Sequence, residues 1–185
     1  MEDFHTPTES ADISYMERAL VEASVAAQMG EVPVGAVIVY SGEIIGRGRN
    51  RREELQNPLC HAEISAIEEA SRALGSWRLA ECDIFVTLEP CVMCMGAILQ
   101  ARLRRLVFGC LDAKAGAAES LYRLGEDARL NHRLPTSGGV LAEECAALLA
   151  NFFSRLRREK SSTETRRGGR ARLKALDSKS SLPTG

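Results

Sequence analysis

The stretch DIFVTLEPCVMCMGAILQARLRRLVFG, residues 83–109, decides the fold. Its two ends, residues 83–88 and 105–109, are short apolar runs of the kind that form buried strands. Between them, residues 91–102 have the length and composition of a helix. Because a strand, a helix and a second strand in this order form a unit whose strands run parallel, we expect an α/β protein with a partly parallel sheet.

Two further runs on the N-terminal side extend this sheet. Residues 35–40 (GAVIVY) and 43–48 are rich in strand-forming side chains. They are separated by Ser41 and Gly42, a two-residue turn signal that predicts an antiparallel hairpin. Residues 61–74 then predict a second helix. Because an antiparallel hairpin would join a parallel pair, the central sheet should be mixed.

The sequence predicts a helix near each end of the domain. Ser14 and Glu17 form a capping-box pattern at the start of an amphipathic stretch that Gly30 ends. An apolar stripe over residues 141–156 predicts a last helix. Residues 50–60 lie between predicted elements and are expected to form a loop.

Length and composition favour one folded domain with two flanking segments. The chain has 185 residues, of which 45% are hydrophobic and 26% charged, enough for one substantial core and too few for two full domains. We expect a flexible N-terminus over residues 1–11, one folded domain over 12–160 and a basic tail over 161–185. Because that tail lacks apolar content, it is expected to be disordered.

The sequence predicts a soluble, cytoplasmic protein. The N-terminal segment is polar and acidic, and no apolar run approaches the roughly 20 residues needed to cross a bilayer. In a reducing compartment, the six cysteines would serve as metal ligands or small packed side chains rather than form disulfides.

One pair of short segments has the spacing of a metal site. Residues 61–63 read His-Ala-Glu, and residues 90–94 read Pro-Cys-Val-Met-Cys. Cys91 and Cys94 are three residues apart, so on a helix both sulfurs can face one ion. Pro90 suits the start of that helix, where the positive end of the dipole favours the thiolates that a metal requires.

His61 and Glu63 are expected to have different roles. They are about 200° apart around a regular helix, so both cannot bind one ion from the side of a continuing helix. We expect them in a first turn, with His61 as the third zinc ligand. Three protein ligands leave zinc one position for water, and two thiolates make the metal a weak Lewis acid. A general base is then required, and Glu63 is placed to be that base.

Two other interpretations apply to these residues taken singly. His61 could be a hydrogen-bonded core histidine, and the cysteine pair could belong to a structural zinc knuckle. A structural site would need a fourth ligand, for which the candidates are Cys60, Cys82, Cys110, Cys145 and His132. The combination of both segments favours a catalytic zinc site.

The two segments resemble those of the cytidine and deoxycytidylate deaminase superfamily. Within it, the chain is most similar to the bacterial tRNA-specific adenosine deaminases over approximately residues 12–160. The resemblance extends to residues 31–37 (EVPVGAV), 78–79, 87–94 (TLEPCVMC), 107–109, 112–114, 131–133 (NHR) and 139–149.

This resemblance implies a fold, an assembly and a reaction. The fold would be a three-layer α/β/α arrangement of the cytidine-deaminase type with a mixed central sheet. The protein would form a homodimer whose partner subunit helps to shape the RNA site. It would hydrolyse adenosine to inosine at the wobble position of a tRNA anticodon, by zinc-activated hydroxide with Glu63 as the proton shuttle. One Zn2+ per subunit would be held by His61, Cys91 and Cys94.

The resemblance also implies a set of substrate contacts. Asn50, Pro33, Val34 and Ala62 would surround the target base. Asp112, Lys114, Asn131 and His132 would contact neighbouring nucleotides, and Phe153 would stack on a flanking base. From the residues alone, Asn50 and Asn131 could equally be turn formers, Lys114 could be solvated, and Phe152 is better explained by core packing.

Other functions remain open at this stage. The chain could deaminate a free nucleobase or nucleoside of the guanine or cytosine type, because the zinc segments are shared by those enzymes. It could also be a non-catalytic RNA-binding subunit that keeps zinc for stability, although Glu63 argues against this. The basic tail could be an arm that binds RNA phosphates.

Overall fold

The computed structural model describes the backbone of residues 9–177 and the side chains of residues 10–159. Two compact units, Met1–Leu149 and Ala150–Gly185, divide the chain. The elements, in order, are α1 (Glu9–Gln28), β1 (Gly35–Tyr40), β2 (Glu43–Arg49), α2 (Arg52–Leu55), α3 (Ala62–Leu74), β3 (Cys82–Leu88), α4 (Val92–Gln100), β4 (Arg105–Cys110), a 3-10 turn (Leu124–Glu126), β5 (Thr136–Ser137) and α5 (Ala142–Asp177).

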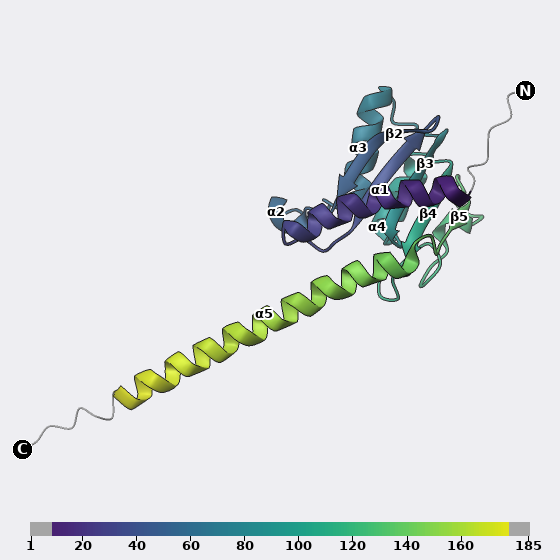
Figure 1. The fold of residues 1–185 in the computed structure, drawn as a ribbon. Coiled ribbons are helices and arrows are strands. Elements are labelled where there is room, and N and C mark those ends of the chain that lie inside the picture. The colour runs from purple at the N-terminus through teal and green to yellow at the C-terminus, as the bar shows by residue number, and fades with distance from the viewer. Residues whose placement is uncertain (1–8, 178–185) are drawn as a thin grey trace, which may run out of the picture. The chain divides into compact units, whose positions relative to one another are not determined.

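The first unit is built on a mixed sheet with the strand order β2-β1-β3-β4-β5 (Figure 1). β1 is antiparallel to both β2 and β3, whereas β3, β4 and β5 are parallel. The predicted hairpin and the predicted parallel pair are therefore both confirmed. Ser41 and Gly42 have φ values of 49° and 83°, the left-handed conformation that a tight two-residue hairpin turn requires.

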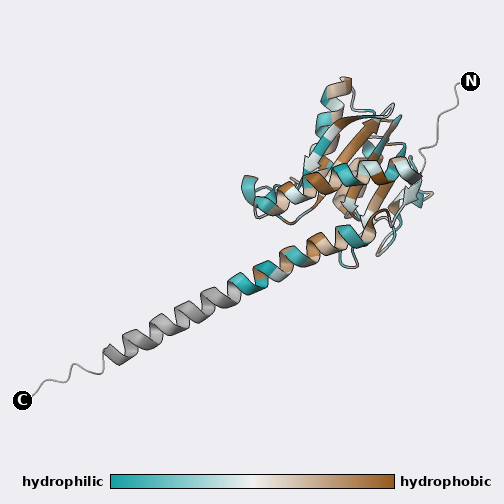
Figure 2. Cartoon of the chain, viewed as in Figure 1, coloured by the Kyte–Doolittle hydropathy of each residue, from teal (hydrophilic) through white to brown (hydrophobic). Residues whose placement is uncertain are grey.

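Helices cover both faces of this sheet, which gives the expected three layers. On one face, α3 and α4 bury Ala66 and Ile98 together with Ile84 of β3. On the other, α1 buries Met16 against Phe85, the next residue of the same strand. Side chains alternate between faces along a strand, so β3 contributes to both cores. Figure 2 shows the central strands of the sheet mainly in the brown of hydrophobic residues.

Glycines in β2 bring α3 close to the sheet. A Cβ atom added at Gly48 would lie 1.9 Å from the carbonyl oxygen of Ala62, and one at Gly46 would lie 2.4 Å from that of Ala66. Any larger residue would push the helix away, because real Cβ atoms do not approach backbone this closely. The close approach of α3, whose first turn follows the predicted ligand His61, thus depends on the absence of a side chain at Gly46 and Gly48.

The start of α1 differs from the prediction. The helix spans Glu9–Gln28, so Ser14 and Glu17 lie inside it and do not form a capping box. Acidic residues near a helix N-terminus are favoured by its dipole, and Asp12 also accepts two hydrogen bonds from Arg105 of β4. This tertiary contact stabilises an early turn that the local pattern did not reveal.

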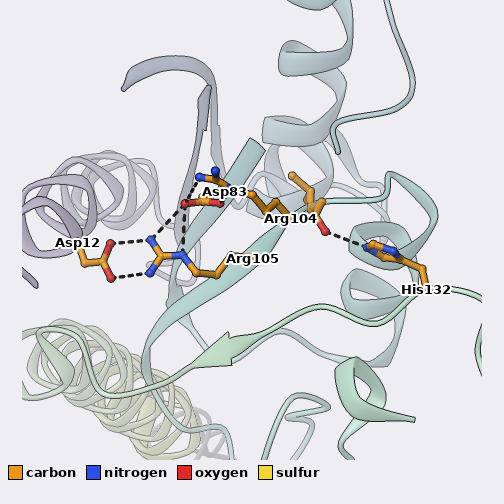
Figure 3. Close-up of polar contacts among 6 residues, drawn as sticks. Asp12, Asp83, Arg104, Arg105 and His132 are labelled. Carbon is orange, nitrogen blue, oxygen red and sulfur yellow. Dashed lines mark hydrogen bonds and ion pairs between the residues drawn. The ribbon is translucent and has the colours of Figure 1, made fainter. Parts of the chain in front are cut away.

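Asp12 belongs to a buried ionic network (Figure 3). The Arg105 guanidinium donates to Asp12 at 2.7 and 2.9 Å and to Asp83 at 3.2 Å. Asp83 also accepts from Arg104 at 2.8 and 3.0 Å. The network joins α1 to the N-terminal ends of β3 and β4.

Two predicted segments differ in detail from their expected form. Residues 50–60 are mostly loop, as expected, but include the single turn α2. The predicted last helix is present as α5, which continues to Asp177. The expected boundary at residue 160 stays a prediction, as does the N-terminal segment, of which residues 1–8 lie outside the described part of the chain. Among the described helices, none is both long enough and apolar enough to cross a membrane.

Candidate functional site

The three predicted metal ligands come together at the ends of two helices. His61 is the N-cap of α3, Cys91 is the N-cap of α4, and Cys94 lies in the first turn of α4. Both N-cap residues have extended backbones, and neither side chain caps its own helix. Their side chains are thus available to each other. The sequence predicted Pro90 at the start of this helix. In the structure, Pro90 is the residue before the N-cap Cys91, so it lies just outside α4.

The spacing of these atoms fits a tetrahedral metal site. His61 Nδ1 lies 3.8 Å from Cys91 Sγ and 3.5 Å from Cys94 Sγ, and the three atoms all lie within 4.8 Å of one another. Ligands around a tetrahedral zinc, with bonds of about 2.3 Å to sulfur and about 2.0 Å to nitrogen, are about 3.6 Å apart. This group could therefore hold a zinc ion without rearrangement.

The protonation of the cluster also suits a cation. Hydrogen bonds from Cys94 and His61 hold the pKa of the Cys91 thiol at about 3. The same contacts raise the pKa of Cys94 and the pKa of His61, because each donates its proton to the Cys91 thiolate. A divalent cation would replace those protons, so metal binding is expected to release them.

Glu63 is buried beside the cluster. It lies in the first turn of α3 and is only 4% exposed. Its Oε2 atom has no hydrogen-bond partner among the described residues. Burial raises the pKa of Glu63 above the usual range for a carboxyl, which brings it closer to the range useful for proton transfer.

A pocket opens over these residues at the C-terminal end of β3. Its volume is about 230 Å³, below the roughly 300–1,000 Å³ of pockets for drug-sized ligands, so it suits one small heterocycle. The lining residues are Val32, Val34, Asn50, Arg52, His61, Glu63, Leu88, Glu89, Cys91, Asp112 and Ala115.

Asn50 is held in this pocket by a second buried glutamate. Its Nδ2 donates to Glu31 Oε2 at 3.2 Å, and its backbone N–H donates to the Val34 carbonyl at 3.0 Å. Glu31, 1% exposed, also accepts from the Glu54 backbone N–H at 2.7 Å. Asn50 is thus a buried, oriented amide rather than an exposed turn residue.

Only some of the other predicted contact residues line the pocket. Val34, Asn50 and Asp112 line the pocket, whereas Pro33 and Ala62 are buried beside it and are not part of the lining. Lys114 is exposed two residues after Asp112.

Asn131 and His132 lie at a different place on the first unit, at the turn between α4 and β4. Asn131 Oδ1 accepts from Arg102 at 3.2 Å, and His132 Nε2 donates to the Leu103 carbonyl at 2.9 Å (Figure 3). Both bonds involve the turn that follows α4, whereas the metal ligands lie at its start. Phe153 belongs to the second unit, where it is 42% exposed and packs edge-on against Phe152.

Five lining residues were not predicted: Val32, Arg52, Leu88, Glu89 and Ala115. Leu88 and Glu89 directly precede the Pro-Cys segment, and Val32 directly precedes the predicted Pro33 and Val34. These three residues could have been predicted, because each is next in sequence to a predicted site residue or to the metal-binding segment. Arg52 has no signal in the sequence that separates it from the other arginines around it.

Comparisons with known proteins agree with this site. The family model described as "Cytidine and deoxycytidylate deaminase zinc-binding region" matches residues 9–110. The chain is 47% identical over 149 residues to the tRNA-specific adenosine deaminase of Bacillus subtilis (strain 168), covering 80% of this chain and 92% of that protein. It is 48% identical over 146 residues to the enzyme of the same name from Streptococcus pyogenes serotype M18, covering 79% and 92%.

Solved structures share the fold. One comes from a study of A-to-I editing by tRNA:A34 deaminases at the wobble position of transfer RNA. It is 46% identical, with a TM-score of 0.71, and covers 74% of this chain and 99% of that one. The guanine deaminase of Nitrosomonas europaea is 23% identical, with a TM-score of 0.65, and covers 76% and 83%. At that identity, the second likeness concerns the fold alone.

Proposed function

This chain belongs to the cytidine and deoxycytidylate deaminase family, and from that premise we propose that it hydrolyses adenosine to inosine at the wobble position of a tRNA anticodon. The observation that carries the proposal is the cluster of His61, Cys91 and Cys94, which lies with Glu63 and Asn50 at one small pocket. The relatives that are nearly half identical over about four fifths of the chain support adenosine in tRNA as the substrate.

His61, Cys91 and Cys94 would hold one Zn2+ per subunit. Bound zinc would supply Lewis acidity, which makes a water molecule nucleophilic enough to attack carbon 6 of the adenine. The donor set fits this metal, because two sulfurs and one imidazole nitrogen are typical zinc ligands and leave a position for water.

Glu63 is the proton shuttle in this proposal. Its carboxylate takes a proton from the attacking water and delivers it to N1 of the adenine ring. The other proton of the same water, passed by Glu63 to the exocyclic amine, lets that group leave as ammonia, so adenosine and water give inosine and ammonia. The buried, unpartnered Oε2 and the raised pKa of Glu63 support this role.

The walls of the pocket would hold the flipped base. Asn50 offers an oriented amide to the edge of the base, and Val34 with Leu88 supplies apolar surface for its faces. Pro33 and Ala62 support these walls from behind. Asp112, which lines the pocket, and Lys114, whose backbone N–H donates to Asp112, would contact the target nucleotide or its neighbours.

Three other proposed RNA contacts depend on more than the first unit of one chain. Asn131 and His132 are remote from the start of α4, so their contact with substrate would require a second subunit or RNA that extends beyond the pocket. Phe153, exposed in the second unit, would stack on a flanking base.

A homodimer is part of the proposal. Large apolar side chains are exposed at the start of α4 and on the segments after β4, namely Val92 (52%), Leu111 (60%), Leu121 (52%) and Tyr122 (54%). Side chains of this kind are enriched where subunits meet. A tRNA substrate and six unpaired cysteines also support a cytoplasmic location.

The test uses an anticodon stem-loop RNA with adenosine at the wobble position. The zinc-loaded protein should form inosine, detected by nucleoside mass spectrometry, and Glu63→Ala should lose at least about 100-fold in rate while keeping one zinc per chain. Free adenosine, guanine and cytosine are assayed in parallel. Turnover of a free base with no inosine in the stem-loop would refute the tRNA assignment in favour of the alternative deaminase.

A further inference from the structure

Glu89 is a buried carboxylate that the proposed reaction does not use. It lies between β3 and the ligand Cys91 and is 2% exposed. Its Oε1 accepts the backbone N–H groups of Ala118, Glu119 and Ser120 at 3.1, 2.7 and 2.8 Å. Its Oε2 accepts the Asp112 N–H at 2.9 Å and the Ser120 hydroxyl. All of these donors belong to one segment, residues 111–120, which we call the 111–120 loop.

The 111–120 loop forms one side of the substrate pocket. Asp112 and Ala115 line the cavity directly. The Asp112 carboxylate accepts the backbone N–H groups of Lys114 and Ala115 at 2.9 and 3.2 Å, so the position of Asp112 determines the shape of the turn. A shift of Asp112 would therefore move this whole side of the pocket.

The same loop is joined to the metal-binding segment. Cys91 and Gly116 form an antiparallel bridge, and Ala117 N–H donates to the Pro90 carbonyl at 2.8 Å. A Cβ atom added at Gly116 would lie 2.2 Å from Glu89 Oε2. The backbone therefore lies so close to the carboxylate that no residue with a side chain would fit at this position.

We propose that Glu89 is a positioning residue that holds the 111–120 loop in register with Cys91, so that Asp112 and Ala115 meet the substrate base at a fixed distance from the metal site. This inference rests on the proposed function, because it assigns Glu89 to substrate binding at the same pocket. It predicts an effect on KM, whereas Glu63 governs proton transfer and hence kcat.

A carboxylate is required because every partner of Glu89 is a donor. A glutamine has one acceptor oxygen and one NH2 group, and the NH2 group must face at least one N–H. If that group faced Ala118, Glu119 and Ser120, three bonds would be lost. It should therefore take the place of Oε2, where the Ser120 hydroxyl can reverse its role but the Asp112 N–H cannot. Glu89→Gln is thus expected to release Asp112 selectively.

The experiment compares Glu89→Gln with two further variants of the full-length, zinc-loaded protein. Ser120→Ala removes one neutral donor and leaves the four backbone N–H contacts, so it is the matched control. Gly116→Ala displaces the 111–120 loop from Glu89 without changing the carboxylate. Zinc per chain, the thermal midpoint, KM and kcat are measured for each, with the wobble-adenosine stem-loop as substrate.

Glu89→Gln and Gly116→Ala should each keep one zinc per chain and raise KM about tenfold or more, with kcat changed less than about threefold. Ser120→Ala should change both constants less than about threefold. A Glu89→Gln protein with normal zinc and an unchanged KM, or with a reduced kcat alone, would overturn the proposal. If Glu89→Gln does not fold, an unchanged KM in Gly116→Ala would overturn it.

These outcomes are separable from those of the proposed function. If the wild-type protein deaminates a free base and not the stem-loop, the tRNA assignment fails, and the same KM comparison is made with that base. If the wild-type protein deaminates the stem-loop and Glu89→Gln matches its KM, the role of Glu89 fails alone.

Discussion

Asn50 cannot turn its amide over without losing a buried hydrogen bond. Glu31 has no donor when ionised, so only the Nδ2 side of Asn50 can face it, and the two groups are 3.2 Å apart. The orientation of the amide that meets the base is thus determined by a residue outside the pocket lining.

The substitution Glu31→Gln should disturb the orientation of the Asn50 amide. The other oxygen of Glu31 accepts the Glu54 backbone N–H, so a glutamine would keep its oxygen there and turn its NH2 group towards Asn50. The Asn50 amide would then be favoured in the flipped orientation, with its oxygen accepting from that NH2 group. We expect KM for the stem-loop to rise about tenfold, with one zinc per chain retained. Steady-state kinetics and metal analysis would measure this. Glu22→Gln, which changes a glutamate 4.0 Å from Arg49 on the α1 side, is the control, and equal KM values in the two variants would contradict the argument.

Cys82 predicts a pH dependence of stability. Burial raises the pKa of its thiol to about 11 in the folded protein, above the ordinary value of 9.0. The folded chain therefore keeps this proton to higher pH than the unfolded chain. The resulting contribution to stability is complete below pH 9 and is lost as the pH rises towards 11.

Cys82→Ala removes this titration. Between pH 9 and 11, the wild-type protein should lose about 2 kcal/mol more of its free energy of unfolding than the variant does. Urea unfolding at several pH values would measure the difference. A gap between the two proteins that stays constant across this range would show that burial of Cys82 has no such consequence.

At the level of single residues, the sequence predicted what local geometry determines. The three-residue spacing of Cys91 and Cys94 and the position of His61 at a helix start were sufficient to predict the metal cluster, and the structure brings these atoms together. The partners of Glu31 and Glu89 lie more than 18 residues away along the chain, and no periodic pattern marks such contacts.

At the level of elements, periodicity predicted the hairpin, the parallel pair and most helices, because alternation and helical spacing record which side faces the core. The start of α1 was wrong because Asp12 is held by Arg105, 93 residues later in the chain. A capping-box pattern is local and does not register such a contact.

Arg105 should matter for stability and not for catalysis. Its side chain is 16% exposed and is shared between Asp12 and Asp83, which are 12% and 2% exposed. Arg105→Met leaves Asp12 without its partner and should cost about 3 kcal/mol of unfolding free energy. Arg104→Met, at a side chain 38% exposed, should cost about 1 kcal/mol or less.

Urea unfolding of zinc-loaded protein would test this difference. Because the network lies at the N-terminal ends of β3 and β4, and the pocket lies at the C-terminal end of β3, kcat and KM should be unchanged in both variants at temperatures where they are folded. Equal stability losses in the two variants would contradict the assigned importance of Arg105.

At the scale of the whole molecule, RNA binding depends on where the positive charges lie and not on the net charge. The chain has a net charge of −1, so it has little overall attraction for RNA. Of the residues that line the pocket, Glu63, Glu89 and Asp112 are acidic, and Arg52 is the one arginine or lysine. Arg52 is exposed, and among the described side chains no salt bridge involves it.

Arg52→Ala should therefore weaken RNA binding through the loss of a phosphate contact. The affinity for the stem-loop should fall, and the slope of log K against log salt concentration should decrease by about 1, while one zinc per chain is retained. Filter binding at several salt concentrations would measure both. Arg18→Ala, an exposed arginine of α1, is the control, and a slope that Arg52→Ala leaves unchanged would exclude a phosphate contact there.

The unpartnered oxygen of Glu63 has a consequence for the evolution of this position. A buried carboxylate whose oxygen is paired with no other protein group lowers the stability of the fold, and a leucine at this position would relieve that cost. Selection for heat resistance alone would therefore favour replacement of Glu63. Only continued selection for the reaction can keep this residue in place, so its persistence in a lineage would be a record of activity.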